Sequence, residues 1–258
     1  MFFNTRCLFA LTTLLALSAN ACSASSARAA RTSAGPRSCA GSVIRNTDDA
    51  ARFTDCTAVN GDLRIESSEL SDLTALESLR NVSGALTIAN NSQLSDFTGL
   101  EQLTSVGSLS VHDNAVLTDF SGLSALHSAR VVDIRRNPAL SSLTGLEGLT
   151  RVDKLELVND AVFDTAGLSG LREVGELTIT GNPRLISLGG LNGLQRARTV
   201  QIRNNRVLCA KLGLLPQLGE VSDGLELNAN RSVSNSEVES LRAHVRAPLA
   251  QHAVIASR

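Results

Sequence analysis

The sequence predicts an all-β fold, a parallel β-solenoid of about eight coils with a cap at each end. Two observations support this prediction: an apolar residue recurs at a nearly constant spacing, and a polar residue, usually Asn, follows it at a fixed distance. The steps between successive apolar residues are 23, 23, 23, 23, 22, 23 and 25. Such a period is typical of proteins in which each repeat forms one coil. The recurring residues are Leu63, Leu86, Leu109, Val132, Leu155, Leu177, Val200 and Leu225.

Each recurring residue begins a short strand pattern, because a second apolar residue lies two positions later. Alternate residues of a strand point to the same side, so both members of each pair are expected to face inward. One such strand buries little surface alone, whereas stacked coils share one continuous core. The second residues are Ile65, Ile88, Val111, Ile134, Leu157, Ile179, Ile202 and Leu227.

The recurring polar residue lies five positions after the first apolar one, where the chain must bend away from the strand. An amide carries both donor and acceptor groups, so stacked Asn side chains can bond turn backbone groups. Each such group would cost about 1–3 kcal/mol if it were buried unpaired. Pro138 and Pro183 follow two of the Asn residues, as expected in a turn. We interpret the series as a structural Asn ladder: Asn91, Asn114, Asn137, Asp160, Asn182, Asn205 and Asn230, with Ser68 in the equivalent place of the first coil.

Further apolar columns extend the core to the far side of each coil. The runs TGLEQL, SGLSAL, TGLEGL and GGLNGL supply two leucine columns. The spacing of Val106, Leu109, Val111 and Asn114 resembles a leucine-rich-repeat strand, and the phrase beginning at Val174 repeats it. Another inward column is expected from Leu94, Leu117, Leu140, Phe163, Leu185 and Leu208.

The N-terminal segment, residues 1–21, resembles a secretory signal peptide. Arg6 precedes an apolar run that is too short to span a bilayer. Two interpretations remain open at its end: cleavage after an Ala-x-Ala motif, or lipidation of Cys22 as in bacterial lipoproteins. Residues 22–38, rich in Ala, Ser and Arg, are expected to form a flexible tether. The predicted location is therefore secreted or an outer-envelope lipoprotein, with membrane contact only through the N-terminal lipid.

Residues 39–58 precede the first coil and are expected to cover the open end of its core. The run DDAARF suits a short helix, and a disulfide between Cys39 and Cys56 would close the cap. Secretion makes this bond plausible, and a loop of this size would contribute about 3 kcal/mol. The solenoid itself is then expected over residues 59–233.

Around this cap the chain resembles the receptor L domain, the ligand-binding solenoid of the insulin-receptor and epidermal-growth-factor-receptor families. The resemblance rests on Cys39-Ala40-Gly41, IRN, Cys56 and VNGDLRI, followed by coils in the style of LTSVGSLSV and GLEGL. It covers about Cys39 to Asn230 and implies a right-handed parallel β-helix related to leucine-rich repeats. The regular sequence is also similar to free-standing bacterial secreted proteins with such repeats.

Residues 234–258 are expected to form a C-terminal helical cap and tail. Ser234 or Ser236 suits the N-cap position before Glu237. Val238, Leu241 and Val245 are expected on one helical face, which suits a lid over the last coil. A bare surface helix is the alternative.

The formal net charge of −1 gives no electrostatic reason to expect a nucleic-acid partner. The outward positions of the strands form a broad face of the kind that solenoids use for binding. The ligand expected there is a protein or a glycan, and no cofactor is expected. The charged residues of the candidate binding face are Arg64, Glu66, His112, Asp133, Arg135, Lys154, Glu156 and Arg203.

An enzymatic alternative rests on Asp133 and Glu156, which should lie about 4.8 Å apart on neighbouring strands. An acid pair beside His112, Arg135 and Lys154 could cleave a polysaccharide. No aromatic platform for sugar rings is predicted on this face, however, so we prefer a solvated face of compensating charges and assign no catalytic residue. The predicted function is a non-enzymatic extracellular or envelope binding module. A structural envelope or matrix protein without a discrete ligand is the first alternative, and a carbohydrate-active β-helix enzyme is the second.

The coil spanning residues 152–173 departs from the pattern, since Asp160 replaces Asn, Ala166 replaces a core Leu or Phe, and the spacing shortens by one. Its acidic residues suggest calcium, but their spacing matches no calcium-loop pattern, so we prefer an irregular coil without metal. Cys209 lies just beyond the inward Leu208 and is interpreted as a buried or half-buried free thiol.

Overall fold

The computed structural model describes residues 36–209, 214–230 and 232–245. The chain divides into two compact units, residues 1–34 and residues 35–258, and every described residue belongs to the second unit. The predicted signal peptide and the proposed lipidation at Cys22 therefore lie outside the described residues.

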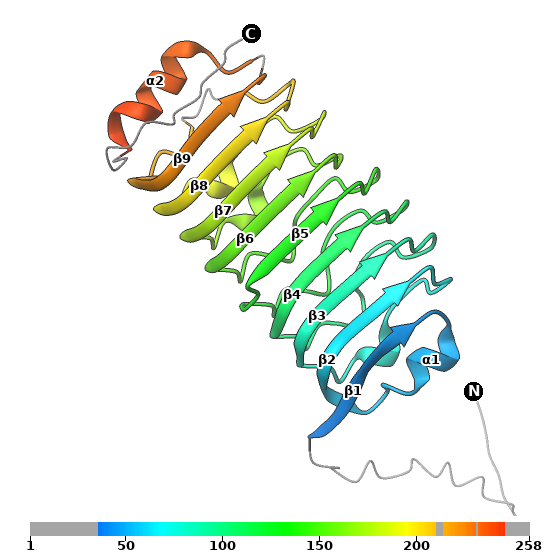
Figure 1. Cartoon of the computed structure of the whole chain (residues 1–258). Helices are drawn as coiled ribbons and strands as arrows, with labels where there is room; N and C mark the ends of the chain where they lie inside the picture. The colour runs from blue at the N-terminus through cyan, green and yellow to red at the C-terminus, as the bar shows by residue number, and fades with distance from the viewer. Residues whose placement is uncertain (1–35, 210–213, 231, 246–258) are drawn as a thin grey trace, which may run out of the picture. The chain divides into compact units, whose positions relative to one another are not determined.

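Nine strands form one sheet whose order follows the sequence and whose neighbouring strands are all parallel (Figure 1). The register pairs the recurring residues directly, for example Leu86 with Leu109 and Leu109 with Val132. This arrangement confirms the predicted parallel β-solenoid. The strands are β1 (Arg37–Ile44), β2 (Cys56–Glu66), β3 (Asn81–Ala89), β4 (Ser105–His112), β5 (Val131–Arg135), β6 (Arg151–Val158), β7 (Glu173–Thr180), β8 (Arg196–Arg203) and β9 (Glu220–Asn228).

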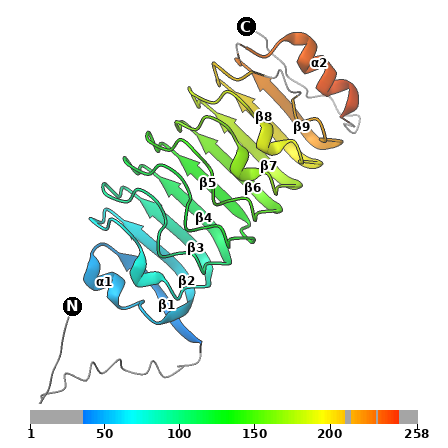
Figure 2. The ribbon, with the colours of Figure 1, turned by 180° about the vertical axis from the view of Figure 1, so that it is seen from behind.

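The chain returns from each strand to the next through tight turns on the reverse side of the solenoid (Figure 2). Three of these returns contain a short 3-10 helix: η1 (Thr74–Leu76), η2 (Ala166–Leu168) and η3 (Gly189–Leu191). The leucines of the returns are buried and meet the inward residues of the strands in one core. Within it, the rings of Phe97 and Phe120 stack with their centroids 5.2 Å apart.

The Asn ladder follows the strands along one edge of this core, and its side chains are buried. Asn114 shows the pattern. Its Nδ2 donates to the carbonyl of Ile88 at 3.0 Å and to Oδ1 of Asn137 at 3.2 Å, and its Oδ1 accepts from the backbone N–H of Asn91 at 3.1 Å. One amide therefore bonds groups of the preceding coil and of the following coil.

The backbone explains why a polar residue is needed there. The residue before the ladder position turns the chain through the left-handed region, with φ of 57° at Asn90, 58° at Asp113 and 53° at Arg136. This turn directs backbone N–H groups toward the neighbouring ladder side chain, away from the strand pairing. Because the site is closed to solvent, the amide replaces water as their partner.

The coil that starts with β6 has a carboxylate in the ladder. Oδ1 of Asp160 accepts from the N–H of Asn137 at 2.8 Å and from its Nδ2 at 3.0 Å. Oδ2 is buried and has no hydrogen-bond partner among the described residues. In the neighbouring coil Asn137 donates its Nδ2 to the carbonyl of Val111, and a carboxylate has no donor with which to make the equivalent bond. Burial raises the pKa of Asp160 to about 6.

The same coil corrects two sequence-based expectations. Phe163 was expected to point inward, but it is 39% exposed, and Val162 takes the inward place. The physical reason is that the missing residue lies between Asp160 and this core position, so the core residue follows the ladder residue by two positions. For the same reason the buried residue of the next column is Thr165, whereas Ala166 is exposed.

Both ends of the solenoid are covered. At the N-terminal end, β1 pairs with β2, and helix α1 (Thr47–Ala51) is capped by Asn46, whose side chain accepts from the N–H of Asp49 at 2.9 Å. At the C-terminal end, helix α2 (Asn235–His244) begins with a capping box in which Ser234 and Glu237 bond each other reciprocally.

Packing rather than isolated helicity holds α2 in place. Val238 and Leu241 are buried and join the core cluster of the solenoid. The backbone N–H of Ser234 donates to the carboxylate of Glu237 at 2.7 Å, and this bond lowers the pKa of Glu237. The helix therefore covers the last coil, as one of the two sequence-based alternatives expected.

Candidate functional site

The strand face, defined here as the outward side chains of β2–β9, carries all the charged residues that the sequence singled out. The structure brings four of them together on β5 and β6. Asp133 pairs in register with Glu156, and Arg135 hydrogen-bonds both carboxylates. The ammonium group of Lys154 lies 3.1 Å from Glu156. We call these four residues the central charge cluster.

Ion pairing fixes the central charge cluster. The pKa of Arg135 is raised, first by its hydrogen bond to Asp133, because the charged guanidinium is stabilised between two carboxylates. The guanidinium occupies the space between Asp133 and Glu156. A glycosidase needs that space for the glycosidic bond or the attacking water, so this geometry disfavours the polysaccharide-cleaving alternative.

Three of the other selected residues lie apart from this cluster, and His112 on β4 pairs in register with Arg135. Arg64 and Glu66 form their own pair on β2, with Arg64 Nη2 2.6 Å from Glu66 Oε1, and Arg203 on β8 pairs with Glu226 on β9. His112 does not contact the acid pair. Its Nδ1 lies 2.9 Å from Oδ2 of Asp113, a carboxylate outside the strands.

Asp113 belongs to a small group at the ends of the strands. Arg136 donates two hydrogen bonds to it, at 2.7 and 2.6 Å. This bidentate contact is the main reason why the pKa of Asp113 is lowered. The face therefore presents separate neutralised ion pairs rather than one large field of a single charge.

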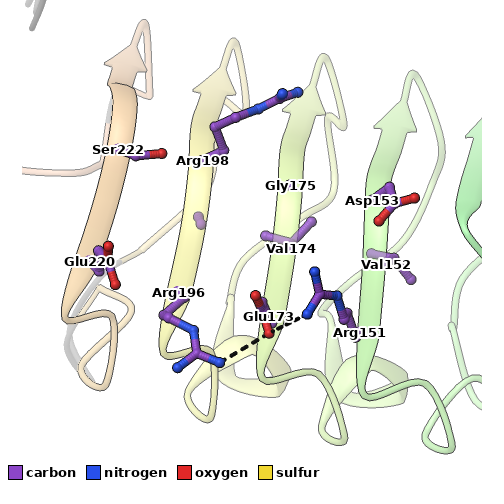
Figure 3. A pocket seen from close by; sticks show the side chains of 11 residues that line it. Arg151, Val152, Asp153, Glu173, Val174, Gly175, Arg196, Arg198, Glu220 and Ser222 are labelled. Atoms are coloured by element: carbon purple, nitrogen blue, oxygen red, sulfur yellow. Dashed lines mark hydrogen bonds and ion pairs between the residues drawn. The ribbon is translucent and has the colours of Figure 1, made fainter.

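Sequence reasoning missed a hollow at the starts of β6–β9 (Figure 3). Its volume is about 250 Å³. At its centre the carboxylate Oε2 of Glu173 accepts from Arg151 Nη1 at 3.2 Å and from Arg196 Nη2 at 3.1 Å. Figure 3 shows Glu173 between these two guanidinium groups, with Gly175 further along the same strand.

The sequence contained a signal for this hollow. Arg151, Glu173 and Arg196 each lie four residues before the recurring apolar residue of their coil, so the repeat places them side by side. The register confirms that Arg151 pairs with Glu173 and that Glu173 pairs with Arg196. Aligning the coils at this position, and not only at the outward strand positions, would have found the group.

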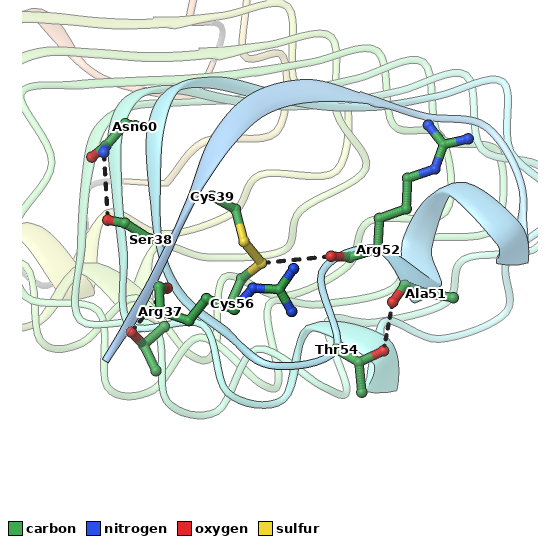
Figure 4. The surroundings of a disulfide bond; sticks show 9 residues. Arg37, Ser38, Cys39, Ala51, Arg52, Thr54, Cys56 and Asn60 are labelled. Carbon is green, nitrogen blue, oxygen red and sulfur yellow. Dashed lines mark hydrogen bonds between the residues drawn. A yellow bond between two sulfur atoms is a disulfide. The ribbon is translucent and has the colours of Figure 1, made fainter. Parts of the chain in front are cut away.

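The predicted disulfide between Cys39 and Cys56 is present and joins β1 to the start of β2 (Figure 4). The Cα atoms are 5.9 Å apart, within the usual range for a disulfide. Sγ of Cys56 also lies 3.7 Å from the carbonyl of Arg52, so the bond ties both strands to the chain that follows α1. We call it the cap disulfide. Cys209 is a half-buried free thiol.

The described part of the chain comprises residues 36–209, 214–230 and 232–245. In this part of the chain no group of three or more His, Cys, Asp or Glu side chains could hold a metal ion, and the acidic coil with Asp160 is included in that statement. The helices described there are too short or too polar to cross a membrane.

Comparison with known proteins gives one positive finding. The family model described as Receptor L domain matches residues 55–217, which is more than half of the chain. The matched segment runs from the end of the N-terminal cap to the turn before β9. No curated protein and no solved structure gives a significant match.

Proposed function

The chain belongs to the receptor L domain family, and on that basis we propose that it is a non-enzymatic binding module that takes a protein or glycan ligand on its strand face. Receptor L domains are ligand-binding domains without catalytic activity of their own. The family match is the observation that carries the proposal.

Two features support the strand face as the place of binding. Its side chains stand on a continuous hydrogen-bonded sheet, so their positions are fixed by a rigid framework, which favours precise recognition. The face also mixes ion pairs with small hydroxyl residues such as Thr87, Ser110 and Thr178, and so offers many hydrogen-bonding groups without a strong net charge.

An extracellular place of action is supported by the family and by the cap disulfide, since disulfides persist in oxidising compartments. We further propose that the mature protein is secreted or held in the outer envelope by a lipid on Cys22. Mass spectrometry of the mature N-terminus tests this. A lipid mass on Cys22 supports anchoring, whereas an unmodified N-terminus indicates free secretion.

Site-specific photo-crosslinking tests the binding face. A photoreactive amino acid replaces Thr178 on β7, and in a matched variant it replaces Ser124, an exposed residue of the reverse side. Irradiation of cells that produce the protein should give a discrete adduct from the Thr178 variant and little from the Ser124 variant. Equal labelling from both positions contradicts the strand-face proposal. Adducts that contain only a second copy of the chain would instead support the structural matrix alternative.

A further inference from the structure

We propose that the hollow beside Gly175 binds an acidic side chain of a peptide segment in a partner protein, and that basic residues flank that acidic side chain. The hollow lies at the starts of β6–β9, whereas the central charge cluster lies on the outward strand positions of β5 and β6. The proposal therefore adds a site at the margin of the strand face, apart from the central charge cluster, and its test is independent of crosslinking from Thr178.

The centre of the hollow is positive. Glu173 supplies one negative charge between the two positive charges of Arg151 and Arg196. A guanidinium has five N–H donors, and each of these two arginines uses only one of them in its hydrogen bond to Glu173. Both side chains are largely exposed, so the remaining donors are open to a ligand. Carboxylates match the fork of N–H groups that arginine presents.

Each of the two outermost strands of the hollow, β6 and β9, contributes one carboxylate to its lining. Arg198 lines the hollow, but it forms ion pairs with Glu176 and Asp223, so its charge is offset locally. Asp153 on β6 and Glu220 on β9 also line the hollow, and among the described residues neither carboxylate has a hydrogen-bond or ion-pair partner. The hollow therefore presents three charged regions: the partly used guanidinium groups of Arg151 and Arg196, and one carboxylate on each outermost strand. Strand β6 carries both Arg151 and Asp153, and Glu220 lies beside Arg196 in the register of β8 and β9.

This charge pattern decides the class of ligand. A peptide can carry an acidic residue between two basic ones and so match all three regions. An acidic polysaccharide has no cationic group, so Asp153 and Glu220 would repel it. The described lining residues also include no aromatic ring for a sugar to stack on. The pattern thus favours a mixed-charge peptide.

The dimensions agree with an extended segment. Strands β6 and β9 are three strand spacings apart, which is about 14 Å. An extended chain rises about 3.3 Å per residue, so two basic residues four positions apart, with the acidic residue midway, span nearly the same distance.

Gly175 lines the hollow at a place where two coils approach each other closely. A Cβ at this position would lie 2.2 Å from the carbonyl oxygen of Asp153, so close packing of the coils requires glycine here. The hollow's volume of about 250 Å³ is smaller than the roughly 300–1,000 Å³ of sites for drug-sized ligands. It suits one carboxylate side chain and its adjoining backbone.

The test uses a synthetic peptide, acetylated lysine-serine-glutamate-serine-lysine amide, titrated into the purified chain and followed by amide chemical shifts. Two comparison probes are the same peptide with glutamine in place of glutamate, and polygalacturonate. The variant R151Q/R196Q removes both central cations. R130Q is the matched control, because Arg130 is an exposed arginine of the neighbouring coil outside the hollow.

We expect saturable shifts at Glu173, Gly175 and Ser222 with the glutamate peptide. The affinity should fall at least tenfold in R151Q/R196Q and with the glutamine peptide, and less than twofold in R130Q. Three results would each overturn the proposal: no saturable shift up to about 10 mM peptide, an equal loss in R130Q, or binding of polygalacturonate as tight as that of the peptide. Circular dichroism of each variant verifies that the fold is intact, and crosslinking from Thr178 is read separately.

Discussion

Replacing Asp160 by Asn should stabilise the protein at neutral pH and leave it nearly unchanged in acid. Asp160 is the ladder residue whose Oδ2 is buried without a partner, and its carboxylate lacks the donor that the other amides of the ladder supply. The substitution restores the amide N–H donor that the other ladder residues direct to a carbonyl of the preceding coil, as Asn137 does to Val111. It therefore removes a buried charge and adds a hydrogen bond at the same atom.

The size and the sign of the effect follow from the pKa. The folded-state value for Asp160 is raised from 3.8 to about 6, so the folded protein prefers the neutral acid. Below pH 3.8 the carboxyl is protonated in both the folded and unfolded states and costs nothing. Between pH 3.8 and 6 stability is progressively lost, and above pH 6 the full cost remains, about 3 kcal/mol at roughly 1.4 kcal/mol per pH unit. The restored hydrogen bond contributes about 1 kcal/mol more.

Urea unfolding of the parent and of Asp160→Asn at pH 4, 5, 6, 7 and 8 measures this difference. The variant should gain about 2–4 kcal/mol at pH 8 and less than about 1 kcal/mol at pH 4. Asp153→Asn, an exposed acid of the same coil, is the control and should stay within about 0.5 kcal/mol at every pH. A gain that does not depend on pH, or no gain at pH 8, would refute the reasoning.

Three further outcomes are expected. Asn182→Leu leaves the carbonyl of Leu157 and the N–H of Asp160 without a partner, so it should lower the free energy of unfolding by at least about 2 kcal/mol in urea melts. The control Thr178→Ala should change it by less than about 0.5 kcal/mol. A stable Leu variant would argue against a ladder that bonds the backbone. The cap disulfide closes a loop of sequence separation 17, so its reduction should lower the free energy of unfolding by about 3 kcal/mol. The melting temperature should fall and return on reoxidation, and an unchanged melting temperature would contradict this. Gly122→Ala places a Cβ 2.1 Å from the carbonyl oxygen of Phe97 at a φ of +97°, so it should lower the urea midpoint strongly. Gly224→Ala has open space around its Cβ and should change the midpoint little. Equal midpoints would refute the packing argument.

Most of the fold could be predicted from the sequence because every coil of a solenoid repeats the same strand and turn pattern. The period placed Leu63, Leu86 and Leu109 in one column, and the register of β2, β3 and β4 pairs these residues. Each further coil fits the same alignment, so an error in the placement of one strand would have disagreed with its neighbours. The disulfide followed from the position of Cys39 and Cys56 on either side of the cap.

The irregular coil could not be resolved from the period alone. When a coil is one residue shorter than the others, the missing residue can lie before or after the core position. In both cases the next strand keeps its place in the repeat. Packing decides: Val162 fits the column of Leu140 and Leu185, while Phe163 remains outside with Arg184 over its ring at 4.2 Å. The period of the repeat alone does not tell which of the two residues is buried.

The hollow required information of a different kind. Its charged residues come from separate coils, and each alone resembles an ordinary solvated surface residue. Their relation depends on the exact register of β6, β7 and β8, which pack closely at Gly175. Sequence reasoning that followed the outward strand positions therefore selected the central charge cluster and passed over this group.

The ladder also determines how unfolding should spread through the coils. Each Asn amide bonds the coil before it and the coil after it, so melting one coil weakens both neighbours, and disruption spreads along the row. At Asp160 this linkage loses its donor. The lost bonds concern both the preceding and the following coil, so we expect two cooperative blocks under heat or mechanical load, with their boundary at the coil of β6. Amide hydrogen exchange at pH 8 should show two protection classes that meet there, and at pH 4, where the Asp160 carboxyl is protonated, the two classes should merge into one.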